Sequence, residues 1–325
     1  MKNQHLLLYL ALACLTNGCA FGQLMPAKWT ATVKVAGEDS APIVGAEVSV
    51  SYNIQPPPPD PKQKQYGEVK GLTDENGTFI ASHMDKSLGL SVNVTKDGYY
   101  TSRAGYQFYF DDTRRNPTFI MTLKRIGKPI AMYARKVQIE IPETNMPIGF
   151  DLVESDWVSP YGKGKQADFI FQANRRWVNR KDFDCTLKLT FSKAGDGLIP
   201  ISIPLDQGSE LRMSAIAPTN GYLPEISKGL SHTPANGWTD DEREANKEAN
   251  YYFRVRTAID DRGNIVSAHY GKIYYDFALD PINSKTTWIL FTYYFNATPN
   301  DRNTEFDSKQ NLIHDLRFDE DVKAP

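Results

Sequence analysis

The sequence of 325 residues has few cysteines, few histidines and almost no net charge. It contains 3 cysteines and 5 histidines, and its formal net charge is -2. A charge this close to zero excludes a strongly basic surface that would draw the whole chain to nucleic acid. Cys14 and Cys19 lie in residues 1–22, so a mature chain without that segment keeps Cys185 alone. One cysteine forms no internal disulfide, and the fold must therefore rest on packing.

The motifs of several common enzyme classes are absent. A zinc peptidase needs His and Glu at close spacing, and none of His83, His232, His269 and His314 has a Glu two to four residues away. The chain has no Gly-x-Ser-x-Gly elbow, and the run GKGK at 162–165 lacks the Ser or Thr of a phosphate-binding loop. The sequence therefore predicts a protein without a cofactor and without a recognisable catalytic centre.

Long apolar stripes at helical spacing are missing as well, whereas residues that favour strands are frequent. The chain has 17 tyrosines and 16 phenylalanines. In AEVSVSY at 46–52, Ala46, Val48 and Val50 alternate with polar residues, as in a strand that is buried on one face. Such runs recur between turn signals at short intervals. This pattern predicts an all-β chain with two tandem β-sandwich-type domains.

Residues 1–22 have the features of a signal peptide. Lys2 supplies a positive charge, and the apolar run 6–15 is too short to span a bilayer. Small residues then precede Gln23, which suits cleavage there, whereas lipidation at Cys19 is the alternative. We expect an exported protein, located in the periplasm, on the cell surface or outside the cell, with membrane attachment only if Cys19 carries lipid.

The stretch GLTDENGTFI at 71–80 is either a calcium loop or a turn. Asn76 and Gly77 both tolerate positive φ, which a primed hairpin turn requires. Calcium needs several further oxygen ligands, typically closed by a bidentate Glu, whereas the chain continues directly into a strand-like run at 78–80. We interpret the cluster as a hairpin turn.

Three stretches within residues 28–125 share a pattern: PIVGAEVSV, GLTDENGTFIAS and LSVNVTKDGYY. They contain a Pro-x-x-Gly-Ala entry to a strand, a Thr-Asp-x-x-Gly-x-Phe turn and a Lys-x-Gly-Tyr exit. This pattern resembles the carboxypeptidase regulatory-like family, a small prealbumin-like (transthyretin-like) β-sandwich. The resemblance implies an accessory, non-catalytic module that is common on exported proteins and is sometimes associated with carbohydrate binding.

The remainder is predicted to form a second, larger β-sandwich or jelly-roll-like domain at 126–300, followed by a C-terminal tail at 301–325. Thr239 to Glu242 read as a capping box, which predicts one short helix over 240–250. IGFDLVESDWVSPYGKGKQADFIF, GKIYYDF and FTYYFNATPNDRNTEFD resemble the C-terminal region of uncharacterised exported bacterial proteins that carry the same module. This second resemblance implies no activity.

Asp151, Glu154 and Asp156 lie beside Trp157 in the run FDLVESDW. Paired carboxylates next to an aromatic subsite are what a glycosidase needs, so these acids are the candidate catalytic residues of a hydrolase. An exposed polar loop is the simpler interpretation, because a chain with 39 acidic residues forms such groups by chance.

The run QANRRWVNRK combines basic and aromatic residues. Strand alternation places Arg175 and Trp177 on one face and Arg176 on the other. A planar guanidinium and an indole ring suit a sugar ring or an anionic polymer, so Trp157, Arg175 and Trp177 are the candidate ligand-binding residues. A solvated strand end is the alternative.

Asp301, Asn303 and Glu305 sit at alternate positions, as in the first part of a calcium loop. However, Phe306 stands where that loop needs glycine, and Leu312 stands where it needs the closing Glu. We therefore predict no metal site and interpret the segment as a solvated loop. The alternative is a metal site in which these three residues are the candidate ligands.

Three functions are compatible with these features. The first is an exported, non-catalytic cell-envelope protein whose partner is a polysaccharide or an envelope protein. The second is a glycan-acting hydrolase that uses a pair of carboxylates. The third is a purely structural surface component that is anchored by lipid at Cys19. Nucleic acid is not an expected partner of any of them.

Overall fold

The computed structural model describes most of the chain after residue 26. The described residues are 27–54, 60, 62–63, 65–85, 87–108, 116–204, 207–240, 248–281 and 286–325. They form twenty strands and no helix, in agreement with the predicted all-β class. Within this described part, no apolar helix of membrane-spanning length occurs. The predicted signal peptide and Cys19 lie outside the described residues.

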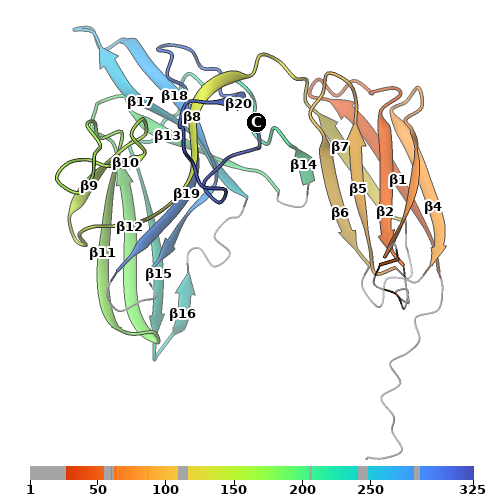
Figure 1. Cartoon of the computed structure of the whole chain (residues 1–325), viewed down its shortest axis with the longest axis horizontal. Helices are drawn as coiled ribbons and strands as arrows, with labels where there is room; N and C mark the ends of the chain where they lie inside the picture. The colour runs from red at the N-terminus through yellow and green to blue at the C-terminus, as the bar shows by residue number, and fades with distance from the viewer. Residues whose placement is uncertain are drawn as a thin grey trace, which may run out of the picture. The chain divides into compact units, whose positions relative to one another are not determined.

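The chain divides into two compact units. The first comprises residues 1–35, 42–93 and 105–120, and the second comprises residues 36–41, 94–104 and 121–325. Figure 1 shows that each unit is built from strands arranged in layers.

The first β-sandwich consists of a three-stranded sheet, β4-β1-β7, and a five-stranded sheet, β14-β6-β5-β2-β3. Its strands are β1 (Ala27–Gly37), β2 (Glu47–Asn53), β3 (Tyr66–Leu72), β4 (Thr78–Asp85), β5 (Gly89–Thr95), β6 (Ser102–Gln107), β7 (Thr118–Leu123) and β14 (Gln207–Ser209). Alternate residues are buried, for example Val48 and Val50 on β2. The rings of Trp29 on β1 and Tyr52 on β2 lie 5.6 Å apart, so the two sheets pack face to face.

The Asp74–Gly77 segment is a turn, as predicted, but it does not close a hairpin. Gly77 has a φ of 68°, and its N–H donates to the carbonyl of Asp74 at 3.0 Å. A Cβ atom on Gly77 would lie 2.4 Å from the carbonyl oxygen of Val35, so only glycine fits. The flanking strands pair with different neighbours, β3 with β2 and β4 with β1. Local turn chemistry reverses the chain, but it does not decide which strands pair.

The second β-sandwich lies entirely in the second unit. One sheet, which we call the β11 sheet, has the order β10-β9-β11-β12-β15-β16, and the other, the β18 sheet, has the order β13-β17-β18-β19-β8-β20. The strands are β8 (Ile130–Glu140), β9 (Pro147–Asp151), β10 (Asp156–Trp157), β11 (Phe169–Asn179), β12 (Asp182–Thr190), β13 (Gly197–Ser202), β15 (Glu225–Thr233), β16 (Gly237–Asp240), β17 (Ala249–Ile259), β18 (Ile265–Asp280), β19 (Trp288–Phe295) and β20 (Phe306–Asn311).

Aromatic side chains fill the core between these two sheets. Phe169 on β11 lies 5.1 Å from Phe253 on β17, and Phe171 lies 5.7 Å from Phe291 on β19, measured between ring centroids. Each ring is almost fully buried, and such burial stabilises the fold by about 1.5–3 kcal/mol per side chain. The two layers are visible in Figure 1, where β11 and β12 face β19 and β18.

The prediction of a short helix over 240–250 is wrong. Asp240 ends strand β16 and Ala249 begins strand β17, and residues 241–247 lie outside the described residues. Thr239, the predicted helix cap, pairs with Ser231 across two strands. Ala249 and Tyr252 pair with β13 on one side of β17, as part of an extended strand. Pairing within a sheet has overridden the local capping signal.

The C-terminal segment 301–325, predicted as a tail, contributes a strand. β20 pairs in parallel with β8. Phe306 and Val322 are each 2% exposed and pack on the face of the β18 sheet that lies opposite the aromatic core.

Candidate functional site

Asp151, one of the candidate catalytic acids, is buried and bound by backbone N–H groups. One carboxylate oxygen accepts from Val153 N at 2.9 Å, and the other accepts from Lys165 N at 2.9 Å and Gln166 N at 3.1 Å. Burial by itself raises the pKa of Asp151, but these hydrogen bonds and one from Glu154 N outweigh it and lower the pKa. Asp151 is therefore a fixed anion that holds the 151–166 segment in place.

Asp151 also belongs to a buried ion cluster that the sequence did not reveal. Arg256 binds Asp168 through two hydrogen bonds of 2.8 Å, and its Nη2 lies 3.3 Å from Asp151 Oδ1. Asp168 is 1% exposed and accepts a further hydrogen bond from Leu152 N at 3.0 Å. Burial raises the pKa of Asp168, although the Arg256 guanidinium acts in the opposite direction. Each carboxylate oxygen of the cluster has a donor, which points to a structural role.

The neighbouring residues of this group are also engaged. Glu154 forms an ion pair with Lys165. Asp156 lies opposite Asp151 in the β9–β10 register, but its oxygens accept from Trp157 N at 2.8 Å and Lys163 N at 3.0 Å. Trp157 is 3% exposed, and its ring packs against Phe150 in the core. The structure thus brings two acids together in register, and it places the neighbouring indole ring in the core.

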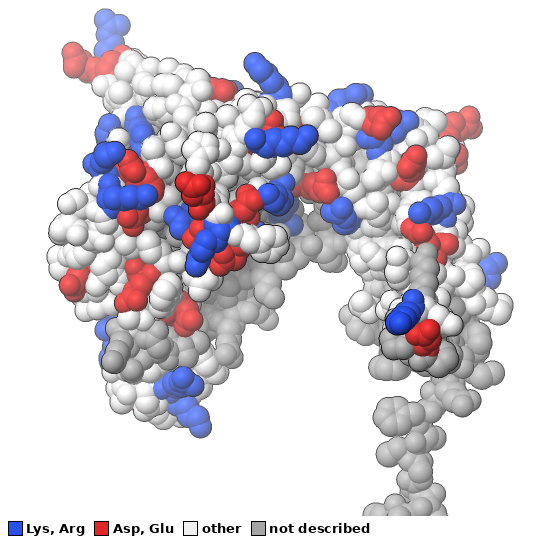
Figure 2. Space-filling view, in the orientation of Figure 1, with Lys and Arg blue, Asp and Glu red and all other residues white. Residues whose placement is uncertain are grey.

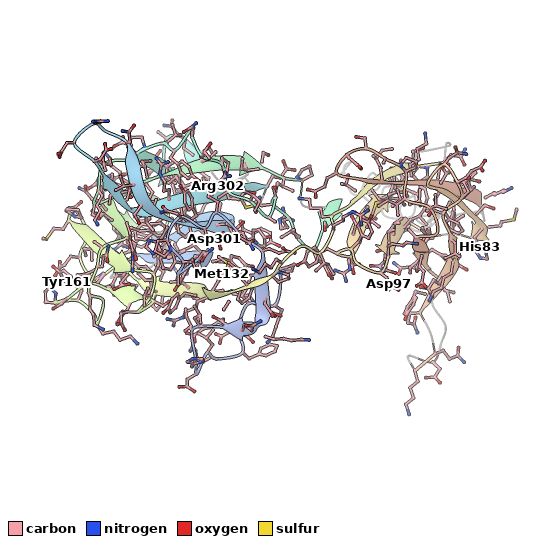
Figure 3. The ribbon with its side chains drawn as sticks, turned by 90° about the horizontal axis from the view of Figure 1, so that it is seen from above. His83, Asp97, Met132, Tyr161, Asp301 and Arg302 are labelled. Carbon is pink, nitrogen blue, oxygen red and sulfur yellow. The ribbon has the colours of Figure 1, made fainter. Side chains whose placement is uncertain are left out.

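The calcium candidates form a chain of short turns in the second unit, where Figure 3 labels Asp301. Asp301 accepts from Asn303 N at 3.0 Å, and Asn303 accepts from Glu305 N at 2.9 Å. Glu305 is 1% exposed and accepts from Gly127 N at 2.8 Å and Lys128 N at 2.7 Å. In the described part of the chain, no group of three or more His, Cys, Asp or Glu side chains is positioned to hold a metal ion.

Cys185 lies in the core of the second sandwich. It is completely buried, and this burial raises the pKa of its thiol to about 12. A thiol with such a pKa is not ionised at neutral pH, so Cys185 serves as a small apolar residue rather than as a nucleophile.

Four aromatic side chains form a row across the end of the β11 sheet. Trp177 on β11 lies opposite Phe183 on β12, Phe183 lies opposite His232 on β15, and His232 lies opposite Trp238 on β16. Directly opposed residues project from the same face of a sheet, so the four rings are neighbours. Their centroids are 5.5 Å apart for Trp177 and Phe183, and 4.9 Å apart for His232 and Trp238. We call these four residues the aromatic row.

The members of the aromatic row differ in exposure. Phe183 is fully buried, Trp177 and His232 are half-buried, and Trp238 is 36% exposed. Trp177 stacks on Phe183 with 25° between the ring planes, whereas Trp238 meets Phe183 edge-on at 74°. Phe183 therefore forms a buried base, and the two indole rings flank it nearer the surface. Indole rings in this position offer an apolar contact area together with a polar N–H group.

Arg175 adds a cation to the aromatic row. Its guanidinium carbon lies 4.8 Å from the centroid of the Trp177 ring, and its Nη2 donates to the carbonyl of Pro281 at 3.1 Å. Arg176 lies on the opposite face and binds Asp182 at 2.7 Å, as strand alternation predicts.

The turn between β11 and β12 carries further positive charge beside the row. Arg180 and Lys181 are exposed, and neither forms an ion pair with any described residue. The carbonyl of Lys181 lies 2.6 Å from Nδ1 of His232, which connects this turn to the row. Figure 2 shows basic side chains at the end of the second unit where β11 and β12 turn.

Sequence reasoning identified Arg175 and Trp177 but missed Phe183, His232 and Trp238. The short turn at 180–181 between two strand-like runs was a usable signal, because it places Trp177 close to Phe183 in a hairpin. His232 and Trp238 had no such signal, since their neighbours depend on which strands pair at the sheet edge.

Comparisons with known proteins give fold resemblances at low similarity. No protein-family model and no curated protein sequence matches the chain. One matching solved structure is 3-chlorocatechol 1,2-dioxygenase from Rhodococcus opacus 1CP, with a TM-score of 0.25 and 12% identity over 32% of this chain and 62% of that chain.

Two matching pilins have similarly low scores. The shaft pilin SpaA from Lactobacillus rhamnosus GG has a TM-score of 0.21 and 11% identity over 56% of this chain and 93% of that chain. BcpA, the major pilin subunit of Bacillus cereus, has a TM-score of 0.23 and 11% identity over 86% of this chain and 100% of that chain. With TM-scores this low, these comparisons carry no argument about the fold or the activity of the chain.

Proposed function

We propose that this chain is an exported, non-catalytic cell-envelope protein that binds carbohydrate through the aromatic row. The observation that carries the proposal is the alignment of Trp177, Phe183, His232 and Trp238 across four paired strands. The signal-peptide features of residues 1–22 support export.

The chemistry of the aromatic row suits a sugar chain. The C–H faces of a pyranose ring pack on indole rings, and the hydroxyl groups then meet polar groups at the ring edges. Arg175 is a donor beside Trp177, and Arg180 and Lys181 favour a polymer that carries negative charge. A row that spans several strands matches an extended glycan better than a compact metabolite.

The other two functions expected from the sequence have less support. The hydrolase requires free carboxylates, whereas Asp151, Glu154 and Asp156 are bound by backbone N–H groups or by Lys165. The lipid-anchored surface component depends on Cys19, which lies outside the described residues.

The test is affinity electrophoresis of the full chain in gels that contain a panel of envelope and plant polysaccharides. We expect Trp177→Ala and Trp238→Ala each to weaken binding about tenfold, which corresponds to about 1.4 kcal/mol and is typical of one aromatic contact. Tyr161→Ala is the matched control, because Tyr161 is a 39% exposed aromatic residue of the same unit, at its edge in Figure 3.

Two outcomes would contradict the proposal. The first is that none of the polysaccharides retards the wild-type chain. The second is that Tyr161→Ala weakens binding as much as Trp177→Ala and Trp238→Ala do. Circular dichroism of each variant establishes that it remains folded.

A further inference from the structure

A second unusual feature is a bulge in β18, on the β18 sheet. Tyr274 lies opposite Thr292 of β19, and Ala278 lies opposite Leu290. Between these pairs β18 advances four residues while β19 advances two, so β18 contains two extra residues. Bulges of this kind redirect a side chain and are frequent beside binding sites.

Tyr275, inside the bulge, has a strained backbone. Its φ is 63°, a conformation that bulky side chains rarely adopt. The other described non-glycine residues with positive φ are Ser40, Asn145, Ser155, Arg256, Asn300 and Asp315. Tyr275 is thus the one aromatic residue in this group, and such strain persists only where the surroundings impose it.

A polar network beneath the bulge imposes this conformation. The N–H of Tyr275 donates to the side-chain oxygen of Asn250 at 3.1 Å, and Asn250 is fully buried. Asp276 accepts from the hydroxyl of Tyr251 at 2.6 Å and forms an ion pair with Lys228. These contacts come from two other strands, β17 and β15, so the bulge is a supported part of the fold.

The bulge leaves the Tyr275 ring at the surface of a groove. Its neighbours Tyr274 and Phe277 are buried, whereas Tyr275 is 47% exposed. The groove has a volume of about 320 Å³. Its lining includes Lys136, Gln138, Tyr275, Leu290, Thr292 and Arg317. Lys136 and Tyr275 also line an adjoining hollow of about 350 Å³ that extends to Arg212.

The acidic side chains that line the groove are already paired. Asp319 lies 3.5 Å from Arg317, and Glu320 lies 2.6 Å from Arg135. The third acid, Asp276, is paired with Lys228. These ion pairs neutralise most of the negative charge that the acidic side chains bring to the groove.

The cations near the Tyr275 ring, unlike these acids, have no ion-pair partner among the described residues. Lys136 is exposed, and neither Lys136 nor Arg212 forms an ion pair with any described residue. The guanidinium carbon of Arg212 lies 5.0 Å from the centroid of the Tyr275 ring. Its Nη2 donates to the carbonyl of Ile203 at 3.0 Å. An aromatic ring that shares a hollow with two cations, neither of them ion-paired with a described residue, complements a ligand with a flat apolar face and a negative group.

We propose that this groove and the adjoining hollow, which together we call the Tyr275 groove, bind a uronic acid unit of an acidic glycan. The sugar ring packs on Tyr275, and its carboxylate is bound by Lys136 and Arg212. The groove shares no residue with the aromatic row, so the proposal extends the carbohydrate-binding function to a second site with a defined ligand charge.

The experiment is isothermal titration calorimetry of the full chain with trigalacturonate and, for comparison, with a neutral galactose trimer. We expect trigalacturonate to bind about tenfold more tightly than the neutral trimer, and its affinity to fall as salt rises. Lys136→Ala and Arg212→Ala should each weaken binding by about tenfold. Lys163→Ala is the control, because Lys163 is an exposed lysine elsewhere in the second unit.

Tyr275→Gly separates a binding role from a structural one. Glycine adopts positive φ without strain, so the unfolding midpoint of this variant should stay equal or rise while its affinity for trigalacturonate falls. A lower midpoint with unchanged affinity would overturn the proposal.

The double variant Trp177→Ala, Trp238→Ala distinguishes the two sites. Retained trigalacturonate binding in this variant supports the Tyr275 groove. Loss of that binding, with normal binding by Tyr275→Gly, overturns the groove and leaves the aromatic row as the carbohydrate site. If the wild-type chain does not bind trigalacturonate, the groove proposal fails, whatever the polysaccharide panel shows.

Discussion

Arg256 and Tyr275 have the same unusual backbone conformation but opposite surroundings. Their φ angles are 57° and 63°, and each lies where the pairing of two strands shifts register. The Arg256 side chain turns toward the interior, where Asp168 and Asp151 bind its guanidinium. The Tyr275 side chain turns outward to a groove where Lys136 and, in the adjoining hollow, Arg212 form no ion pair with a described residue.

The difference shows that backbone strain alone does not identify a functional site. At Arg256, hydrogen bonds to buried carboxylates offset the strain, so the protein itself explains the conformation. At Tyr275, the network beneath the bulge holds the backbone, whereas the ring is 47% exposed and has the guanidinium of Arg212 5.0 Å from its centroid. The contacts of the side chain decide between a structural and a binding interpretation.

The largest effect on stability is expected from removing the Arg256 guanidinium from the buried ion cluster. Arg256→Met leaves two buried carboxylates without their cation, which should destabilise the protein by about 3–5 kcal/mol. Urea unfolding followed by tryptophan fluorescence measures this loss. A loss comparable to that of an exposed ion pair would show that the cluster does not stabilise the interior, and the comparison with Tyr275 would fail.

Lys272 extends the comparison to a buried lysine that has no carboxylate partner among the described residues. It is fully buried, its Nζ lies 3.0 Å from the hydroxyl of Tyr274, and it forms no ion pair with a described residue. Lys272→Met keeps the length of the side chain and removes the buried amino group, which forms one hydrogen bond to Tyr274 and no ion pair with a described residue. We expect the variant to be more stable by about 1–3 kcal/mol at pH 7, measured by urea unfolding.

The same variant has a defined pH dependence. Burial lowers the pKa of Lys272 well below its ordinary value, so in the pH range between the folded and unfolded pKa the unfolded chain binds one more proton. The stability of the wild type should therefore rise with pH, by up to about 1.4 kcal/mol per pH unit, relative to Lys272→Met. An advantage of the variant that stays constant from pH 7 to 9.5 would contradict this account.

A smaller effect is expected from relieving the strain at Tyr275. Asn tolerates positive φ, so Tyr275→Asn should stabilise the protein by about 0.5–1 kcal/mol, in contrast to the loss at Arg256. Thermal unfolding of the variant measures the gain. A clear loss would show that the Tyr275 ring contributes more to packing than its exposure suggests.

The smallest effect is expected at an exposed ion pair. Arg176 lies 2.7 Å from Asp182, but its side chain is 51% exposed. Arg176→Met should change the free energy of unfolding by less than about 1 kcal/mol. This variant is the control for Arg256→Met, because both remove an arginine from an ion pair and differ in burial. Equal losses would mean that burial does not distinguish the two pairs.

Parts of the candidate site could be predicted from the sequence. Alternation along one strand correctly placed Arg175 with Trp177 and separated both from Arg176. The acids at 151–156 looked alike in the sequence, whereas the structure shows that donors from distant residues engage them. Arg256, which lies more than one hundred residues further along the chain, has no local signal that connects it with Asp151.

The amino-acid sequence by itself determined the all-β class, the faces of individual strands and the positions of tight turns, because these depend on neighbouring residues. Only the tertiary structure decided that Trp177 and Trp238 share a row, that the turn at Gly77 joins two sheets, that 240 and 249 belong to strands, and that Tyr275 projects from a bulge. The physical reason is that register and strand order arise from hydrogen bonds and packing between residues far apart in the chain, and local periodicity holds no information about them.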